Sequence, residues 1–570
     1  MYLSQKSFNT AVLMISNLLS TPRLPQTLVA GFLVFILSTF LPAACGKTPK
    51  PHADDQDTVW QVPVRQNLMP HFEEANGRKM LFVDGRPFTV LAVEIPWWDL
   101  IYGKTAETMN TYDYLYPAAE AMGMNALKVP VKWSMVEPKQ GVYDFSYLDH
   151  AKSMAEKHHL RLILDWFGHY ASGDGTIYGN LTGELYAPYY IVSDEKTYPR
   201  AVDADGGPHH NTVSYNYPPA VDREVAAFRA FMEHIRQVDS QTYTILMIQV
   251  ENEIAVFGAD RRNRKLWRDH SPASNKLFAQ KGIADELQFS AWNLSWNWIR
   301  PLTNAGADIY PLPFFHNYVG GKLEDGIVGG APGEDVATYL ENCPRITFIG
   351  LNLYAAAETS AEKLRATLGA YRVKRNLPAI TETNSGNDPV APRLAYIAVG
   401  EFGAPIFAPW SLSVSYPTSF QPYVLPDGTL ANGAYALRDT FTSLAMALPQ
   451  VSYHAGTSKL KVFMADLPGK EFSETAEVNG FELTVSGENN GQAIVIHPSG
   501  HEFLIVGYRC GVSFHDSTFH WPAMEHVRVE KGFFTGNEWK QEGAPDYTID
   551  QSHSTLEINL DAPQVVRVFW

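Results

Sequence analysis

Two short stretches of this sequence place carboxylates where acid–base chemistry is possible. Residues 248–253 read IQVENE, so an apolar run ends at Glu251, Asn252 and Glu253. Residues 379–383 read AITET, which places Glu382 directly after a second apolar run. Paired carboxylates can cleave a glycosidic bond, because one donates a proton to the leaving oxygen while the other, ionised, attacks the anomeric carbon. We therefore expect Glu253 and Glu382 to form a catalytic pair.

The elements that must position this pair show a regular pattern. Short apolar runs alternate with helix-length amphipathic stretches, as is typical of parallel strands that are buried on both faces. The runs predict strands at residues 89–95, 126–131, 160–166, 244–250, 308–312, 346–351, 378–381 and 405–408.

Eight such units predict an α/β fold, a (β/α)8 TIM barrel, whose active site lies at the carboxyl ends of the strands. Glu253 would then end the fourth strand and Glu382 the seventh, across the barrel from each other. A doubly wound open sheet is the alternative, but it would require a glycine-rich phosphate loop after the first strand. Residues 96–105 read PWWDLIYGKT and do not form such a loop.

The pattern changes at about residue 455. Alternating apolar and polar runs, separated by turn residues such as ENNG and HPSG, predict an antiparallel β-sandwich. The domains are therefore expected to be a barrel at 66–450 and a sandwich at 451–570. The sandwich could bind glycan or could support the barrel, and we favour the supporting role.

The N-terminal region has the layout of an export signal. Residues 27–44 are apolar, follow Arg23 and end in small residues directly before Cys45. The segment 1–45 resembles a bacterial lipoprotein signal, in which Cys45 would be lipidated. Leu41 lies one residue further from the cysteine than is usual. With a polar tether at 46–65, we expect an exported, membrane-anchored lipoprotein that faces the periplasm or the cell surface. An uncleaved transmembrane anchor is the alternative.

Composition narrows the range of partners. The 61 acidic residues outnumber the 45 basic ones, and the net charge of −16 argues against nucleic acid as the main partner. Cys343 and Cys510 are expected to be buried free thiols, because three cysteines form neither a disulfide framework nor a zinc motif. The adjacent His209 and His210 lack a recognisable third ligand. We expect no metal and no cofactor.

The motifs resemble those of clan A glycoside hydrolases, and more closely those of glycoside hydrolase family 35, the β-galactosidases. IQVENE is similar to the family's strand-four motif. Residues 133–149, WSMVEPKQGVYDFSYLD, are similar to the segment after its second strand, in a form shared with family 42. The resemblance covers about residues 79–450, and the trailing sandwich is like that of a bacterial subset of the family.

This resemblance implies a retaining exo-β-glycosidase that acts by double displacement. Glu253 would be the acid/base, Glu382 the nucleophile, and Asn252 the amide that binds the sugar 2-hydroxyl. The implied substrate is terminal β-D-galactose on oligosaccharides or plant hemicellulose, such as galactosylated xyloglucan. The sequence departs from the family at ENEIAVFG, TETNSG and EIPWW, where ENEYG, TEF or TEW and an HY-containing motif are usual.

Five further residues at predicted strand ends are candidates for substrate binding. Tyr354 resembles a clan A tyrosine that hydrogen-bonds the nucleophile, and Trp410 is placed to form an aromatic floor for the sugar. Glu94, Asp165 and Trp166 end the first and third strands, where they could contact sugar hydroxyls. Core packing is the alternative for the aromatic residues, and ion pairing is the alternative for the carboxylates.

Two other functions fit the same sequence. One is a different clan A β-glycosidase, such as a glucosidase or an endo-glucanase. The other is a non-catalytic glycan-binding surface lipoprotein. A binding protein would not require carboxylates at both strand tips, and the catalytic interpretation is therefore preferred.

Overall fold

The computed structural model describes residues 59–96, 100, 105–169, 185–202, 204, 206–254, 268–319, 336–386, 388–413, 421–515, 526–550 and 555–570. Cys45, the proposed signal segment and most of the tether lie outside these residues. Residues 57–570 form one compact unit. Within the described part of the chain, no helix is long and apolar enough to cross a membrane.

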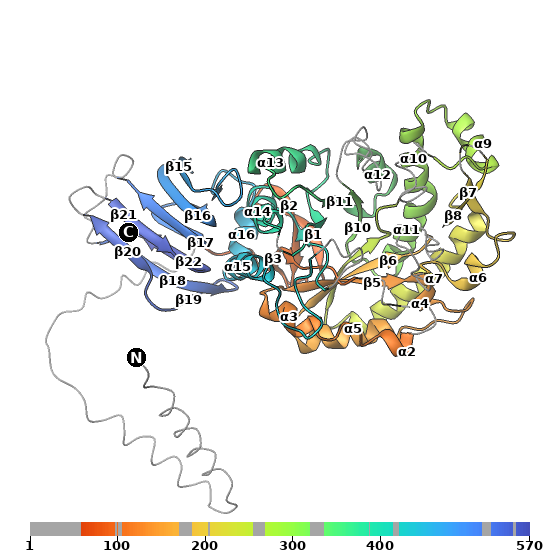
Figure 1. The fold of residues 1–570 in the computed structure, drawn as a ribbon, viewed down its shortest axis with the longest axis horizontal. Coiled ribbons are helices and arrows are strands. Elements are labelled where there is room, and N and C mark those ends of the chain that lie inside the picture. The colour runs from red at the N-terminus through yellow and green to blue at the C-terminus, as the bar shows by residue number, and fades with distance from the viewer. Residues whose placement is uncertain are drawn as a thin grey trace, which may run out of the picture. The chain divides into compact units, whose positions relative to one another are not determined.

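Eight parallel strands form the barrel, and the TIM-barrel prediction is confirmed (Figure 1). The strands pair in sequence order around the sheet, and a parallel bridge between Glu94 and Lys128 joins the two end strands. Ile95 N donates to Lys128 O at 2.9 Å across this junction. The strands are β4 (Val90–Leu91), β5 (Ala126–Lys132), β6 (Arg161–Phe167), β9 (Ile245–Val250), β10 (Phe314–Val319), β11 (Ile346–Leu353), β12 (Ile380–Thr383) and β13 (Ile406–Phe407).

Seven of the predicted strands overlap these elements, but the fifth prediction, at 308–312, is wrong. Residues 308 and 309 end helix α11 (Arg300–Ile309), and the strand begins at Phe314. The helical pattern of residues 290–306 ends at Gly306 and predicts that the helix ends there. A Cβ on Gly306 would lie 2.7 Å from the ring of Phe228 and 2.8 Å from that of Phe314. The glycine therefore allows α11 to pack closely on its neighbours, and the helix continues past it.

Helices cover the outside of the barrel, and several begin at side-chain caps. Ser271, Asp285 and Ser360 each accept a hydrogen bond from the backbone N–H three residues further on. Besides α11, the described helices are α2 (Thr105–Thr108), α3 (Leu115–Ala121), α4 (Trp133–Val136), α5 (Ser146–Lys157), α6 (Tyr189–Val192), α7 (Pro218–Asp239), α9 (Pro272–Lys281), α10 (Glu286–Leu294), η2 (Ser295–Ile299), α12 (Val336–Asn342), α13 (Ala361–Ala370), α14 (Val390–Tyr396), η5 (Ile397–Glu401), α15 (Ala434–Ala445) and α16 (Leu448–His454).

The amino-terminal end of the barrel is closed by a small antiparallel sheet of β1 (His71–Ala75), β2 (Arg78–Val83) and β3 (Arg86–Phe88). Leu81 and Val83 of this sheet belong to one apolar cluster with residues from all eight barrel strands or their flanks. The carboxyl ends of the strands are therefore the end at which a ligand can enter. A second hairpin, β7 (Arg200–Val202) with β8 (Pro208–Val213), lies between β6 and β9 in the chain.

The C-terminal strands are antiparallel and enclose an apolar core, as predicted for the sandwich. They are hydrogen-bonded into one sheet, because the long strands β16 and β17 pair with different neighbours along their two halves. The strands are β14 (Leu460–Met464), β15 (Phe472–Val478), β16 (Phe481–Ile496), β17 (Glu502–Phe514), β18 (Arg528–Thr535), β19 (Glu538–Gln541), β20 (Asp546–Asp550), β21 (Thr555–Leu560) and β22 (Gln564–Phe569).

This sheet is packed on the barrel. Side chains of β14, β16, β17 and β22 belong to the same apolar core as the barrel helices. Gln492 Nε2 donates to the carbonyl of Pro392 in α14 at 3.1 Å, and Tyr508 OH lies 2.9 Å from Thr440 Oγ1 of α15. Cys343 and Cys510 are buried free thiols, as expected.

Candidate active site

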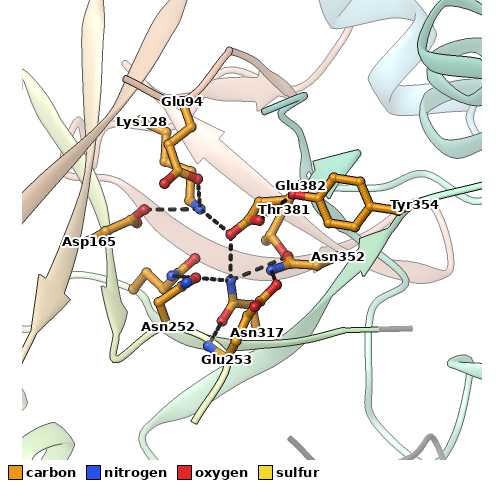
Figure 2. A network of polar contacts seen from close by, with 11 residues as sticks. Glu94, Lys128, Asp165, Asn252, Glu253, Asn317, Asn352, Tyr354, Thr381 and Glu382 are labelled. Atoms are coloured by element: carbon orange, nitrogen blue, oxygen red, sulfur yellow. Dashed lines mark hydrogen bonds and ion pairs between the residues drawn. The ribbon is translucent and has the colours of Figure 1, made fainter. Parts of the chain in front are cut away.

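The two predicted catalytic glutamates lie at the mouth of the barrel and are joined by amide side chains (Figure 2). Glu253 follows β9, and Glu382 lies in β12. Asn317 of β10 accepts a hydrogen bond from Glu253 N at 2.8 Å, and its Nδ2 lies 3.4 Å from Glu382 Oε1. Asn352 of β11 donates to Glu253 Oε1 at 2.7 Å. The strands between the two glutamates thus supply the groups that orient both of them.

Asn352 is itself held in place from β12. Thr381 Oγ1 donates to Asn352 Oδ1 at 2.7 Å, which leaves the amide nitrogen directed at Glu253. The Thr381 side chain occupies the space beside Gly350, where an added Cβ would lie 2.6 Å from its Oγ1. The small residue in β11 therefore makes room for the hydroxyl that fixes the amide.

Asn252 is oriented through its carbonyl oxygen. Its Oδ1 accepts from Asn317 Nδ2 at 2.7 Å and from Gln249 Nε2 at 3.1 Å. Neither contact uses the amide nitrogen of Asn252, which is the donor that the sugar 2-hydroxyl would require.

Glu382 is contacted by a phenol and by a cation. Tyr354 OH donates to Glu382 Oε2 at 2.7 Å, and Lys128 Nζ lies 3.6 Å from Glu382 Oε1. Burial, together with the charges of Glu382 and Glu253, raises the pKa of Tyr354 well above its ordinary value. Tyr354 therefore remains a hydrogen-bond donor at any physiological pH. An adjacent ammonium group suits a nucleophile, which reacts in its ionised form.

Lys128 is the centre of a fully buried charge cluster beneath Glu382. Its Nζ lies 2.6 Å from Glu94 Oε2 and 2.9 Å from Asp165 Oδ2. Burial alone would lower the pKa of Lys128, but Asp165, Glu94 and Glu382 outweigh it and raise the pKa above its ordinary value. The lysine is therefore charged.

The carboxylates of this cluster cannot all be ionised against one ammonium group. Burial raises the pKa of Glu94 well above its ordinary value, even though Lys128 acts in the opposite direction. Burial likewise raises the pKa of Asp165 to about 7, against the effect of Lys128. Burial thus favours the protonated form of Glu94, while Asp165 is close to its titration midpoint at neutral pH.

The other predicted site residues lie in several places. Tyr354 contacts Glu382 as expected, while Glu94 and Asp165 are buried in the lysine cluster, which was the ion-pair alternative. Trp166 packs between the barrel and α7, with its ring 5.1 Å from those of Phe228 and Phe231. The structure therefore places Trp166 away from Glu253 and Glu382.

Trp410 follows β13 and is 5% exposed. Its backbone N donates to Thr383 O at 3.0 Å, directly after Glu382, and its peptide bond to Ser411 is cis. The backbone of Trp410 is thus next to the end of β12, the strand that contains Glu382.

Lys128, Asn317 and Asn352 were not predicted as site residues. Lys128 lies within an apolar run that reads only as a strand, and Asn317 lies in the strand that was misplaced. Asn352 precedes Leu353 and Tyr354 at the end of a correctly predicted strand, so its position at a strand end could have indicated its role. Among the described residues, no group of three or more His, Cys, Asp or Glu side chains is arranged to hold a metal ion.

One known protein family matches a part of the chain. A family model described as a domain of unknown function (DUF5597) matches residues 437–543, which extend from the end of the barrel into the C-terminal sheet. No curated protein has a matching sequence.

Three solved structures illustrate the likeness in fold. The catalytic domain of a β-amylase from Paenibacillus polymyxa is 11% identical, with 62% of this chain and 98% of that chain covered and a TM-score of 0.46. A β-galactosidase from Marinomonas ef1 is 12% identical, with 64% and 62% covered and a TM-score of 0.42. An endo-glycoceramidase II from Rhodococcus sp. is 15% identical, with 88% and 99% covered and a TM-score of 0.42. At these identities and scores the likenesses support no statement about substrate.

Proposed function

We propose that this chain is a retaining glycoside hydrolase in which Glu253 is the acid/base and Glu382 is the nucleophile. The observation that carries the proposal is the pair of carboxylates after β9 and in β12, oriented through Asn317 and Asn352. A pair of oriented carboxylates is the machinery that glycosidic cleavage requires.

The contacts of each carboxylate suit its role in a double displacement. In the first step Glu382 forms a bond to the anomeric carbon as the glycosidic C–O bond breaks, and the proton of Glu253 moves to the leaving oxygen. The hydrogen bond from Asn352 holds the Glu253 carboxyl in one orientation. Tyr354 and Lys128 contact Glu382, which carries the negative charge before the attack and again after hydrolysis. In the second step Glu253 takes a proton from the water that releases the sugar.

The proposed substrate is a terminal β-linked sugar, with β-D-galactose on oligosaccharides or hemicellulose such as xyloglucan as the first choice. This choice rests on the family 35 motifs in the sequence. Exo action and galactose specificity are therefore the parts of the proposal that the choice of substrates must test.

Initial rates on aryl β-glycosides of galactose, glucose, xylose, mannose and fucose test the proposal. Wild type would be compared with Glu382→Gln, Glu253→Gln and the exposed control Glu542→Gln. We expect the galactoside to be cleaved fastest and Glu382→Gln to lose activity by several orders of magnitude. If another glycoside dominates with the same loss, the mechanism stands and the sugar is wrong. Absence of hydrolysis, or full activity of Glu382→Gln, would reject the catalytic proposal in favour of glycan binding.

We also propose that the chain is exported and anchored through a lipid on Cys45. The support is the apolar segment that ends at this cysteine. Metabolic labelling with a radioactive fatty acid should label the wild type and not Cys45→Ser, and the variant should leave the membrane fraction. Labelling of both proteins would reject Cys45 as the attachment site. Retention of an unlabelled variant in the membrane would favour an uncleaved anchor.

A further inference from the structure

A second carboxylate pair lies on the other side of the β9 tip from the catalytic site. Glu251 is the first residue after β9, and its side chain faces the end of β6. Its Oε2 accepts from Gly168 N at 3.2 Å, and its Oε1 accepts from His169 N at 3.3 Å. Glu253, two residues further on, faces β10 and β11 instead. The segment 251–253 is therefore fixed on one side by Glu251 and carries the proposed acid/base on the other.

The partner of Glu251 is Glu224 of α7, which is fully buried. Glu224 accepts from Trp166 Nε1 at 2.8 Å and from Trp298 Nε1 at 3.0 Å, and it forms a short contact with His169 Nδ1. These donors supply what an ionised carboxylate requires in a dry interior. Burial opposes ionisation of Glu224, but His169 and these hydrogen bonds outweigh it and lower the pKa of Glu224.

The oxygens of Glu224 and Glu251 meet over the same glycine. A Cβ on Gly168 would collide with Glu224 Oε1 and with Glu251 Oε1. Two carboxylates in contact cannot both remain ionised in a buried site. Burial and the neighbouring Glu224 raise the pKa of Glu251 well above its ordinary value. Glu251 is therefore the neutral member and can donate a hydrogen bond to Glu224.

The backbone of residues 251–253 has unfavourable dihedral angles that the surrounding structure must impose. Glu251 has φ of 61° and Glu253 has φ of 46°, both in the left-handed region. A residue other than glycine in this region costs about 1–3 kcal/mol and persists only where its surroundings impose it. The three contacts of the Glu251 carboxyl, two from backbone N–H groups and one to Glu224, are the constraint on its side of the segment.

We propose that Glu251 and Glu224 share one proton and that this carboxyl pair positions Asn252 and Glu253 for catalysis. The positioning part rests on the proposed role of Glu253 as acid/base. The shared proton does not depend on that role, so the two parts can be tested separately.

Activity measurements test the positioning. Glu251→Met removes the pair, and we expect kcat to fall roughly 10²-fold with little change in KM. The loss should be greater for glycosides with poor leaving groups, because only these need the proton of Glu253. Glu251→Gln keeps an uncharged donor and acceptor, and should recover most of what Glu251→Met loses. Glu224→Gln should resemble Glu251→Met, because the amide cannot accept from all of its donors.

Glu137→Met is the matched control, because Glu137 is also fully buried and accepts from an indole, that of Trp133. Its loss of activity should be the same for all leaving groups. If Glu251→Met shows the same uniform loss, or if Glu251→Gln recovers nothing, the positioning proposal is overturned.

Infrared difference spectroscopy tests the shared proton without any substrate. Glu94 and Asp165, whose pKa values are also raised, contribute the C=O stretch of a protonated carboxylic acid to every variant at pH 7, so the readout is the difference between wild type and Glu251→Gln. This difference spectrum should contain one further C=O band that belongs to the wild type. A difference spectrum without such a band would overturn the shared proton. If the wild type hydrolyses no glycoside, the proposed function fails, but this band still decides the shared proton. In that case amide hydrogen exchange tests whether the pair holds the segment. Exchange at residues 251–253 should be faster in Glu251→Met than in wild type, and equal rates would overturn the positioning.

Discussion

Replacing Lys128 with methionine should destabilise the barrel and remove most of its activity. The ammonium group is fully buried, 2.6 Å from Glu94 Oε2 and 2.9 Å from Asp165 Oδ2. Methionine has a similar volume and no charge, so the variant would bury Glu94, Asp165 and the adjacent Glu382 without a cation. Removing one partner of a buried ion pair costs about 3–5 kcal/mol. We expect a loss of this size in the free energy of unfolding at pH 7.

The loss should become smaller as the pH falls. Burial raises the pKa of Asp165 to about 7 in the presence of Lys128, and removal of the ammonium group must raise it further. A carboxyl group with a raised folded-state pKa binds more protons in the folded state, so stability falls as the pH rises from about 4 toward that pKa. The variant must bind about one more proton than the wild type to replace the lost charge. At about 1.4 kcal/mol per pH unit, the difference from wild type should be roughly 2–3 kcal/mol smaller at pH 5 than at pH 7.

Urea unfolding followed by circular dichroism at pH 5 and pH 7 measures both quantities. Lys374→Met is the control, because Lys374 pairs with Glu341 on the surface, where the two side chains are 54% and 63% exposed. An exposed pair of this kind contributes less than about 1 kcal/mol. Initial rates of Lys128→Met should fall by roughly 10²–10³-fold, as for loss of one preorganised charge in an active site. A variant as stable as wild type at pH 7, or a loss independent of pH, would refute the reasoning.

Three further substitutions test the site. Asn317→Ala should lower kcat roughly 10²-fold, because this side chain contacts both Glu253 and Glu382; an unchanged kcat would contradict the proposed site. Tyr354→Phe should lower the rate about tenfold and the free energy of unfolding by roughly 0.5–1.5 kcal/mol, as steady-state kinetics and urea midpoints would show; unchanged values of both would remove Tyr354 from the site. Gly350→Ala should destabilise the barrel by about 1–3 kcal/mol, because the new Cβ would collide with Thr381. Gly369→Ala, with no neighbour nearer than 3.8 Å, should be neutral or more stable by up to about 1 kcal/mol; equal melting temperatures of the two alanine variants would contradict this.

The fold was predictable where burial produces a recognisable pattern of apolar residues in the sequence. Parallel strands covered on both faces read as apolar runs, and seven of the eight barrel strands lie where such runs predicted them. The fifth was displaced because a glycine near the end of an amphipathic stretch indicates a helix end. Gly306 instead serves a contact with Phe228 and Phe314 that exists only after folding. The same error concealed Asn317, because its strand was placed too early in the chain.

Side-chain direction at the strand ends was harder to predict. Asp165 and Trp166 are adjacent, and alternation along a strand means that only one of them can face the barrel interior. Both faces of β6 are buried, so the apolar pattern does not distinguish the two. Asp165 faces Lys128, and Trp166 faces α7. The difference depends on how the barrel closes, and local sequence contains little of that information.

Charge balance could have supplied part of the missing information. Glu94, Asp165 and Glu382 were all expected at the ends of buried strands, and buried carboxylates require a cation or a proton. Only two basic residues lie inside the predicted strands: Arg161 is at the amino end of its run, whereas Lys128 is in the middle of ALKVPV. A lysine at that depth is costly unless acidic partners surround it, so it had to lie beneath the carboxylates at the mouth. Three acidic strand ends therefore indicate a buried cation, and the one interior lysine indicates acidic partners. Together they form the buried charge cluster in which Lys128 contacts Glu94, Asp165 and Glu382.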